Sequence, residues 1–205
     1  MSEPKAVADA AEEVVPDVWC WHVADDRLGG YISSAHAVRT DDGTVLVDPL
    51  PLAGDALAAL GDVTAICLTT SGHQRSAWRL RGELGAPVWA PEAVREVEEE
   101  PDRRYSDGDT VPGGLRAVFT PGAGTAQHSL LLERAGGGVL LTPDLFVHLP
   151  GEPLGFVPAE YMHDPDAARR TAERLLDLDF AVLCTGHGVP ITDDPKAAIR
   201  AALAA

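Results

Sequence analysis

Cysteine, basic residues and long apolar runs are all scarce in this sequence of 205 residues. Its three cysteines, Cys20, Cys67 and Cys184, are odd in number and far apart, which argues against a disulfide framework and against a zinc knuckle. No stretch approaches the roughly 18 apolar residues that a membrane-spanning helix needs, and the acidic N-terminus lacks the features of a signal peptide. We therefore expect an unexported protein in a reducing cytoplasm.

Basic side chains are outnumbered two to one by acidic ones. Sixteen Lys and Arg residues stand against thirty-two Asp and Glu residues, which gives a formal charge of -16. Such a protein repels phosphate backbones and anionic membrane surfaces on average, so we expect neither nucleic acid nor a membrane as a partner. The expected partner is a small-molecule ligand or substrate, and the sequence gives no indication of oligomeric state.

What is abundant is apolar sequence arranged in short runs, enough for one sizeable core. Residues 1–13 are alanine-rich and acidic and predict a flexible start, whereas residues 14–205 contain no linker and predict one domain. The continuous apolar run at 63–68 indicates a strand covered on both faces, followed by a polar loop and a helix that ends before Gly85. A further helix is predicted over 91–99.

Two later helices have clear start signals. Asp164-Pro165 and Asp194-Pro195 each combine an N-cap residue with a proline at the first helical position. Between these helices a short apolar strand ends in Thr185-Gly186-His187-Gly188. The segment 150–161 has no periodicity, and such long loops often cover a site.

Four segments, taken in order, resemble motifs of the metallo-β-lactamase superfamily. They are Gly43-Thr44-Val45-Leu46-Val47-Asp48; Thr69-Thr70-Ser71-Gly72-His73-Gln74-Arg75-Ser76; the pair Thr120-Pro121-Gly122-Ala123 and Leu141-Thr142-Pro143-Asp144-Leu145-Phe146; and Thr185-Gly186-His187-Gly188. Together they span most of the chain. The resemblance implies an α/β (α+β) fold, a four-layer αββα sandwich, with a site at the loop edge between the two sheets.

The resemblance also implies a centre of two metal ions, but the ligand positions are only partly kept. Three positions keep the ligand of the family: His73, Asp144 and His187. Four others carry a residue that differs from the ligand of the family: Ser71, Arg75, Ser76 and Ala123. Each metal would keep one histidine and a shared carboxylate, whereas catalytic zinc normally takes three protein ligands and a water.

Arg75 is the most informative of these differences. A guanidinium is permanently protonated and cannot coordinate a metal, so at this position it places a positive charge where a dication would lie. We expect it to pair with Asp144, which would otherwise be a buried carboxylate without a counter-charge. The resulting hypothesis is a hydrolase-like protein that has lost its dinuclear centre, uses no cofactor and binds a small polar or anionic ligand.

Two alternatives stay open at this stage, so whether the protein is an enzyme is undecided. His73, Asp144 and His187 could hold one zinc or another divalent metal that activates a water for hydrolysis, with His128 or His148 completing the site. Ser71 or Ser76 could instead act as a nucleophile without metal. The chain has no Gly-x-Ser-x-Gly element around either serine, and capping of the helix near Ser76 is the preferred role.

The remaining chemistry-bearing residues are assigned structural roles. Cys67 and Cys184 are expected to pack in the core because no basic cluster lies near them in the sequence apart from Arg75. Three histidines without a motif are expected at the surface or in loops: His22, His36 and His163. The sequence names no substrate, since one fold serves many chemistries.

Overall fold

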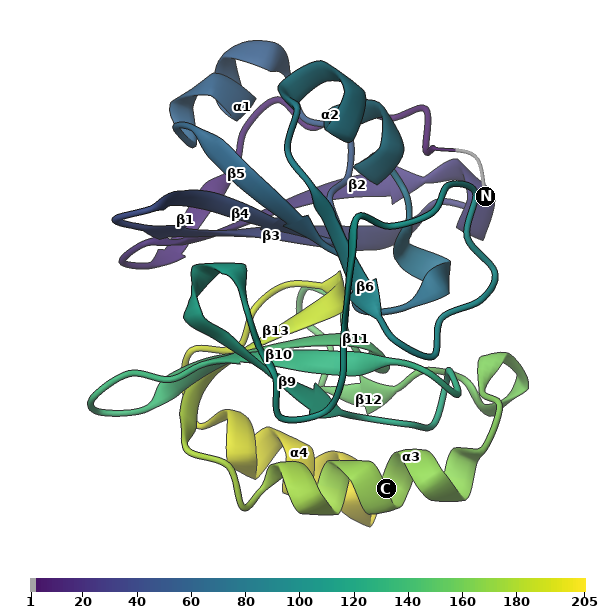
Figure 1. Cartoon of the computed structure of the whole chain (residues 1–205). Helices are drawn as coiled ribbons and strands as arrows, with labels where there is room; N and C mark the ends of the chain where they lie inside the picture. Colours follow the sequence, from purple (N-terminus) through teal and green to yellow (C-terminus); the bar gives the residue numbers. More distant parts are fainter. Residues whose placement is uncertain (1–2) are drawn as a thin grey trace.

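The computed structural model describes residues 3–205 and arranges them in four layers (Figure 1). Two β-sheets face each other in the middle, α1 and α2 cover the outer face of the first sheet, and α3 and α4 cover the outer face of the second. The helices are α1 (Gly54–Ala59), α2 (Ala77–Leu84), α3 (Pro165–Leu175) and α4 (Pro195–Ala204). This arrangement confirms the predicted αββα sandwich.

The first sheet has seven strands that follow one another in chain order. They are β1 (Glu12–Val15), β2 (Val18–Asp25), β3 (Tyr31–Thr40), β4 (Gly43–Val47), β5 (Val63–Cys67), β6 (Val88–Pro91) and β7 (Arg103–Tyr105). Strands β1 to β4 pair antiparallel, and β4 to β7 pair parallel. The change to parallel pairing requires crossovers, and α1 and α2 supply two of them.

The second sheet has six strands, and its centre is the long strand β11. They are β8 (Thr110–Val111), β9 (Leu115–Phe119), β10 (His128–Leu132), β11 (Gly138–His148), β12 (Gly155–Phe156) and β13 (Phe180–Gly188). β13 pairs parallel to β11, with a shift in register between Thr142 and Val147. That irregularity spans Asp144. Part of the aperiodic segment 150–161 forms β12, which pairs with Phe146 and Val147 of β11.

Apolar side chains fill three spaces, one between the sheets and one between each sheet and its helices. The strand faces alternate, so each central strand contributes to two of these layers. Cys67 and Cys184 are fully buried in the layer between the sheets. Burial raises the pKa of the Cys184 thiol to about 12 and raises that of Cys67 further. Both thiols are therefore protonated core residues, as predicted.

Helix ends follow the sequence signals. Asp164 and Asp194 each accept a hydrogen bond from the backbone N–H three residues ahead, which caps α3 and α4. α2 ends at Gly85, whose φ of 69° is in the left-handed region and whose N–H donates to the carbonyl of Arg81. None of the helices within residues 3–205 is both long and apolar enough to cross a membrane.

The predicted helix over 91–99 is wrong. β6 continues to Pro91 and an irregular segment follows, because the buried side chain of Gln74 binds its backbone. The Gln74 amide donates to the carbonyl of Glu96 at 3.0 Å and its oxygen accepts from the N–H of Glu98 at 2.6 Å. These contacts use backbone groups that a helix would need for itself.

The N-terminal segment is packed where a flexible start is predicted, while Met1 and Ser2 lie outside the described residues. Ala8 is buried and forms a bridge with Leu52. Its N–H donates to the carbonyl of Pro51 at 3.0 Å, and its own carbonyl accepts from the N–H of Ala53 at 2.9 Å. Ordered packing therefore begins earlier than the alanine-rich sequence indicates, because backbone pairing holds the segment.

Candidate functional site

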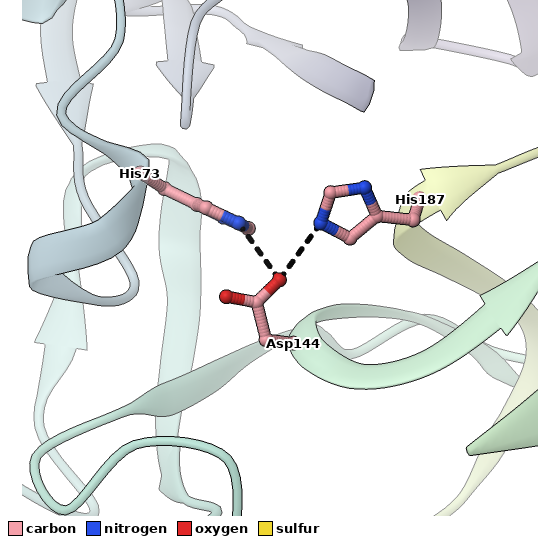
Figure 2. A group of neighbouring side chains, drawn as sticks. All are labelled: His73, Asp144 and His187. Carbon is pink, nitrogen blue, oxygen red and sulfur yellow. Dashed lines mark hydrogen bonds and ion pairs between the residues drawn. The ribbon is translucent and has the colours of Figure 1, made fainter. Parts of the chain in front are cut away.

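Three side chains that are far apart in the sequence converge at the edge where the two sheets meet. His73 lies in the single turn Ser71–His73 that follows β5, Asp144 lies in the irregular part of β11, and His187 lies near the end of β13. One ligand atom from each lies within 4.8 Å of the others (Figure 2). The predicted meeting of these three residues is therefore observed.

One oxygen of Asp144 is the meeting point. Its Oδ1 lies 3.0 Å from Nε2 of His73 and 2.9 Å from Nε2 of His187. Figure 2 shows the two rings approaching this oxygen from opposite sides. The side chain of His73 is 4% exposed and that of His187 is 12% exposed, whereas that of Asp144 is 29% exposed. The solvent-facing part of the cluster is thus the carboxylate.

The other nitrogen of each ring is held in place. Nδ1 of His187 lies 3.0 Å from the carbonyl of Ile32, which can only accept, so this nitrogen carries a proton. Nδ1 of His73 lies 2.8 Å from Oδ2 of Asp48 and donates to that carboxylate. Each ring therefore presents Nε2 to Asp144. Two such tethers fix the ring orientations in the manner usual for metal-binding histidines.

Asp48 is itself tightly positioned. Its φ of 49° is in the left-handed region, and its Oδ1 accepts a hydrogen bond from the N–H of Thr69 at 2.8 Å. The Thr69 hydroxyl donates to Oδ2 of the same carboxylate. Asp48 stands at the end of the Gly43 to Asp48 motif, so the sequence placed it beside the site. Its contact with His73 could not be predicted from the sequence.

The guanidinium of Arg75 is buried inside the site rather than presented to solvent. Nη1 donates to the carbonyls of Ser34 and Asp48 at 2.6 and 3.1 Å, and Nη2 donates to the carbonyl of Gly186 at 3.3 Å. Nη2 also lies 3.1 Å from Nε2 of His73. Arg75 has a φ of 39°, a strained conformation for a side chain of this size, which these contacts maintain.

The expected ion pair between Arg75 and Asp144 does not form within the described residues. Arg75 is held by backbone carbonyls instead, and the direct partners of Asp144 are the two histidines. The guanidinium of Arg75, whose backbone φ is 39°, lies against the carbonyls of Ser34 in β3 and Gly186 in β13 instead. Burial lowers the pKa of Arg75, and the charges of Asp48 and Asp144 oppose that lowering.

The cluster is strongly coupled electrostatically. Burial alone would raise the pKa of Asp144, but the charges and hydrogen bonds of His73 and His187 hold that pKa well below its usual range. Burial and the charge of Arg75 lower the pKa of His73, yet Asp144 and Asp48 outweigh them and the pKa is raised. With neutral rings, two carboxylates face one guanidinium. A proton on His73 would balance the remaining negative charge.

The other predicted site residues do not join the cluster. Ser71 is half-buried and its carbonyl binds the Gln74 amide. Ser76 stands at the N-cap of α2, but its side chain makes no cap hydrogen bond, so the preferred capping role is wrong. No hydrogen bond joins either serine to a histidine among the residues described, so the arrangement offers no activated serine.

Neither Ala123 nor the two histidines expected to complete a metal site, His128 and His148, joins the cluster. Ala123 offers no donor atom, and its carbonyl accepts from the N–H of His163. His128 packs between the rings of Tyr105 and Phe119, and its Nδ1 lies 3.2 Å from the carbonyl of Ala126. His148 binds the carbonyl of Val189 through Nδ1 at 2.7 Å. Neither histidine therefore completes a metal site.

Of the three histidines expected at the surface or in loops, only His163 is exposed. His36 lies in β3 and is 3% exposed, which corrects the prediction. Burial, aided by the neighbouring charges of His22 and Arg75, lowers the pKa of His36 to about 3. His22 lies in β2, half-buried, with Nδ1 at 3.0 Å from the Ser34 hydroxyl.

Three donor side chains converge in the part of the chain that the structure describes, and no other His, Cys, Asp or Glu side chain there joins them. For a single ion, three donors converge and both rings are suitably oriented, but Nη2 of Arg75 lies against the ring nitrogen that the ion would need. An ion could bind His73 only after Arg75 had moved.

Comparison with known proteins agrees with this fold. The family model described as the metallo-beta-lactamase superfamily matches residues 13–204. The DIM-1 metallo-beta-lactamase superposes with a TM-score of 0.73 at 15% identity, covering 96% of this chain and 99% of that one. A metallo-beta-lactamase family protein from Thermus thermophilus gives 0.68 at 20% identity, covering 94% and 80%.

An archaeal metallo-beta-lactamase superfamily protein from Sulfolobus tokodaii superposes with a TM-score of 0.65 at 15% identity, covering 84% of this chain and 79% of its own. A search of curated proteins gives no match. At these identities the solved structures establish the fold alone, whereas the family model spans nearly the whole chain and includes every motif. The four-layer sandwich, the motif order and this match together show that the chain belongs to the metallo-beta-lactamase superfamily.

Proposed function

We propose that this protein is a hydrolase-like member of the superfamily that has lost the dinuclear metal centre and binds a small polar ligand at the former active site. The observation that carries the proposal is the position of Arg75. Its buried guanidinium contacts His73 and is fixed by the carbonyls of Ser34, Asp48 and Gly186.

Nε2 of His73 already has two neighbours, Oδ1 of Asp144 at 3.0 Å and Nη2 of Arg75 at 3.1 Å. A ring nitrogen binds a metal only through a free lone pair, so an ion at this nitrogen would have to displace these neighbours. A guanidinium keeps its proton, so it cannot become a ligand, and its charge repels a dication at this distance. Arg75 therefore supplies a fixed positive charge in the place of an exchangeable one.

The accessible side of the site sets what a ligand can touch. Asp144 is the most exposed member of the cluster and His187 the next, while Arg75 is 4% exposed and bound to carbonyls. The anionic ligand expected from the sequence would have to reach that guanidinium. The carboxylate of Asp144 and the edge of His187 support the polar part of that expectation, whereas the enclosed position of Arg75 counts against the anionic part.

A thermal-shift titration tests the proposal. We expect the melting temperature of the wild-type protein to stay constant when zinc, manganese or iron(II) is added, because no state of the folded protein binds the ion strongly. A rise that saturates with added metal and disappears in His187→Ala would contradict the proposal. His163→Ala, at an exposed position outside the cluster, is the matched control for unspecific histidine binding.

A hydrolase that uses one metal ion is the second candidate, favoured by the convergence of His73, Asp144 and His187 and by the tether on each ring. These three residues would hold the ion, which when bound would make water more acidic and so supply a nucleophile near neutral pH. The same titration separates the candidates, since this one requires the saturable rise and its loss in His187→Ala.

A further inference from the structure

One strand of the first sheet, β3, contacts site residues that come from different parts of the fold. The carbonyl of Ser34 accepts from Nη1 of Arg75 at 2.6 Å, and the carbonyl of Ile32 lies 3.0 Å from Nδ1 of His187. Arg75 follows β5 of the first sheet, whereas His187 belongs to β13 of the second. The position of one side chain relative to the other therefore depends on how β3 is joined to β13.

A side-chain hydrogen bond joins these two strands. The Ser34 hydroxyl donates to the carbonyl of Gly188, the residue that follows His187, at 2.6 Å. Ser34 is 0% exposed and Gly188 is also buried. Because water does not compete for either group, the bond is stronger than the same contact would be at the surface.

His22, the partner of Ser34 on the neighbouring strand β2, orients this hydroxyl. Nδ1 of His22 lies 3.0 Å from Oγ of Ser34, and the two residues are paired in register. Since the hydroxyl proton is donated to Gly188, the oxygen can only accept from His22, so Nδ1 carries a proton. The hydroxyl is thus held from two sides in one orientation.

The end of β13 is confined on its other side by β11. Gly188 has a φ of 99°, and a Cβ added there would overlap the carbonyl of His148. The N–H of Val189 donates to the same carbonyl at 2.8 Å. This strand end therefore lies between β11 and the hydroxyl of Ser34, and the hydroxyl is a contact that a substitution can remove.

Resting on the proposed function, we infer that Ser34 is a positioning residue that sets where His187 lies relative to Arg75 and Asp144. It acts on the ring of His187 through the backbone of Gly188. Without the hydroxyl, the buried carbonyl of Gly188 loses this donor, which is unfavourable, so the strand end should shift and carry His187 with it.

Ser34→Ala and Ser33→Ala form a matched pair of variants. Both serines are 0% exposed, but neighbouring side chains of a strand point to opposite faces, and the Ser33 hydroxyl donates to Oδ2 of Asp25 at 3.0 Å. Each variant therefore loses one buried hydrogen bond, and both should lose stability in urea. Only the bond of Ser34 reaches the strand that carries His187.

Nitrogen-15 NMR of the imidazole rings in the whole protein separates positioning from a merely structural role. His187→Ala identifies the signals of that ring. We expect these signals to move in Ser34→Ala, with Nδ1 losing part of its protonated character as the contact with Ile32 loosens, and to stay in place in Ser33→Ala. Unmoved His187 signals in Ser34→Ala, or equal movement in the two variants, would overturn the inference.

A second variant covers the case in which Ser34→Ala does not fold. Ser34→Cys keeps a side chain of similar shape but replaces the hydroxyl by a weak donor. The same His187 signals should then move by a smaller amount, and signals that stay in place would overturn the inference.

Metal content measured on the same preparation separates failure of this inference from failure of the proposed function. About one or two tightly bound metal ions per chain would overturn the proposed function. Unmoved His187 signals in a preparation that contains no metal would overturn the positioning role of Ser34 alone.

Discussion

The two halves of the site have different environments. The enclosed half consists of Asp48, His73 and Arg75, which are each 4% exposed or less. Asp48 and Arg75 bind backbone groups, and His73 binds the Asp48 carboxylate. The open half consists of Asp144 and His187, which keep the motif residues of the superfamily and remain partly accessible. The sequence change that matters most, Arg75, falls in the enclosed half.

The enclosed and open halves of the site divide two roles that one bound metal ion would combine. A bound dication both neutralises the carboxylates of a site and meets the substrate. In the proposed function, Arg75 performs the neutralising role from inside, and its contacts with backbone carbonyls exclude it from the second role. Any ligand chemistry is consequently left to the open half. Substitutions in the enclosed half should therefore affect mainly stability, and those in the open half mainly binding.

Replacing Arg75 should give the largest effect. Arg75→Met leaves Asp48 and Asp144 without their guanidinium and three carbonyls without a donor, so we expect a loss of about 3–5 kcal/mol in the free energy of unfolding. Urea unfolding measures it. Arg79→Met is the control, because Arg79 forms exposed ion pairs with Glu3 and Glu83 and should cost about 0–1 kcal/mol. Equal losses in the two variants would contradict the assigned role.

Replacing Asp48 should have the next largest effect. Asp48→Asn removes the charged acceptor of the His73 ring and weakens the contacts with Thr69, so we expect a loss of about 1–3 kcal/mol. The NMR signal of the Nδ1 proton of His73 should move or disappear at the same time. Asp42→Asn, in an exposed turn, should change neither quantity. An unaltered His73 signal in Asp48→Asn would show that the ring is held by other contacts.

Substitutions at two glycines, Gly186 beside His73 and Gly72 beside Asp144, allow the stability of the two halves to be compared directly. In Gly186→Ala the new Cβ would come to 2.8 Å from Cε1 of His73, so the ring must shift and we expect a loss of about 1–3 kcal/mol. In Gly72→Ala the new Cβ meets Oδ2 of Asp144 at 3.7 Å, an ordinary contact, and stability should hardly change. Urea unfolding of both proteins checks this order, and the reverse order would show that the open half is the more tightly packed.

A pH dependence is expected at Asp144. Its pKa is lowered in the folded protein, so its ionised form stabilises the fold above the unfolded pKa of about 3.9, and this contribution is lost as the pH falls through the folded pKa. The stability difference between wild type and Asp144→Asn should therefore be largest near neutral pH and shrink in acid. A difference that grows in acid would reverse the assigned sign.

Much of the fold could be predicted because its signals are local. The apolar run that forms β5 and the Asp-Pro starts of α3 and α4 specify elements within a few residues. The segment 91–99 could not be predicted, because the buried amide of Gln74 satisfies its backbone from another element. Long-range side-chain contacts of that kind override the local preference for a helix.

The sequence predicted which residues form the site, but it did not predict how their side chains are oriented. The resemblance of four segments to motifs of the superfamily pointed to His73, Asp144 and His187, which the structure brings together, and the identity of Arg75 indicated a changed charge. That Arg75 would bind carbonyls rather than Asp144 depends on its left-handed backbone, which the sequence does not reveal for an arginine. The burial of His36 was missed for a related reason, because the identity of a polar residue does not show which face of its strand it occupies.

If Arg75 takes the place of exchangeable metal, the isolated protein should contain little metal. The protein should be produced without an affinity tag that binds metal, in medium containing zinc, and analysed for all transition metals per chain. We predict clearly substoichiometric metal in the wild-type protein. About two tightly bound ions per chain, held while Arg75 points to solvent, would contradict the account.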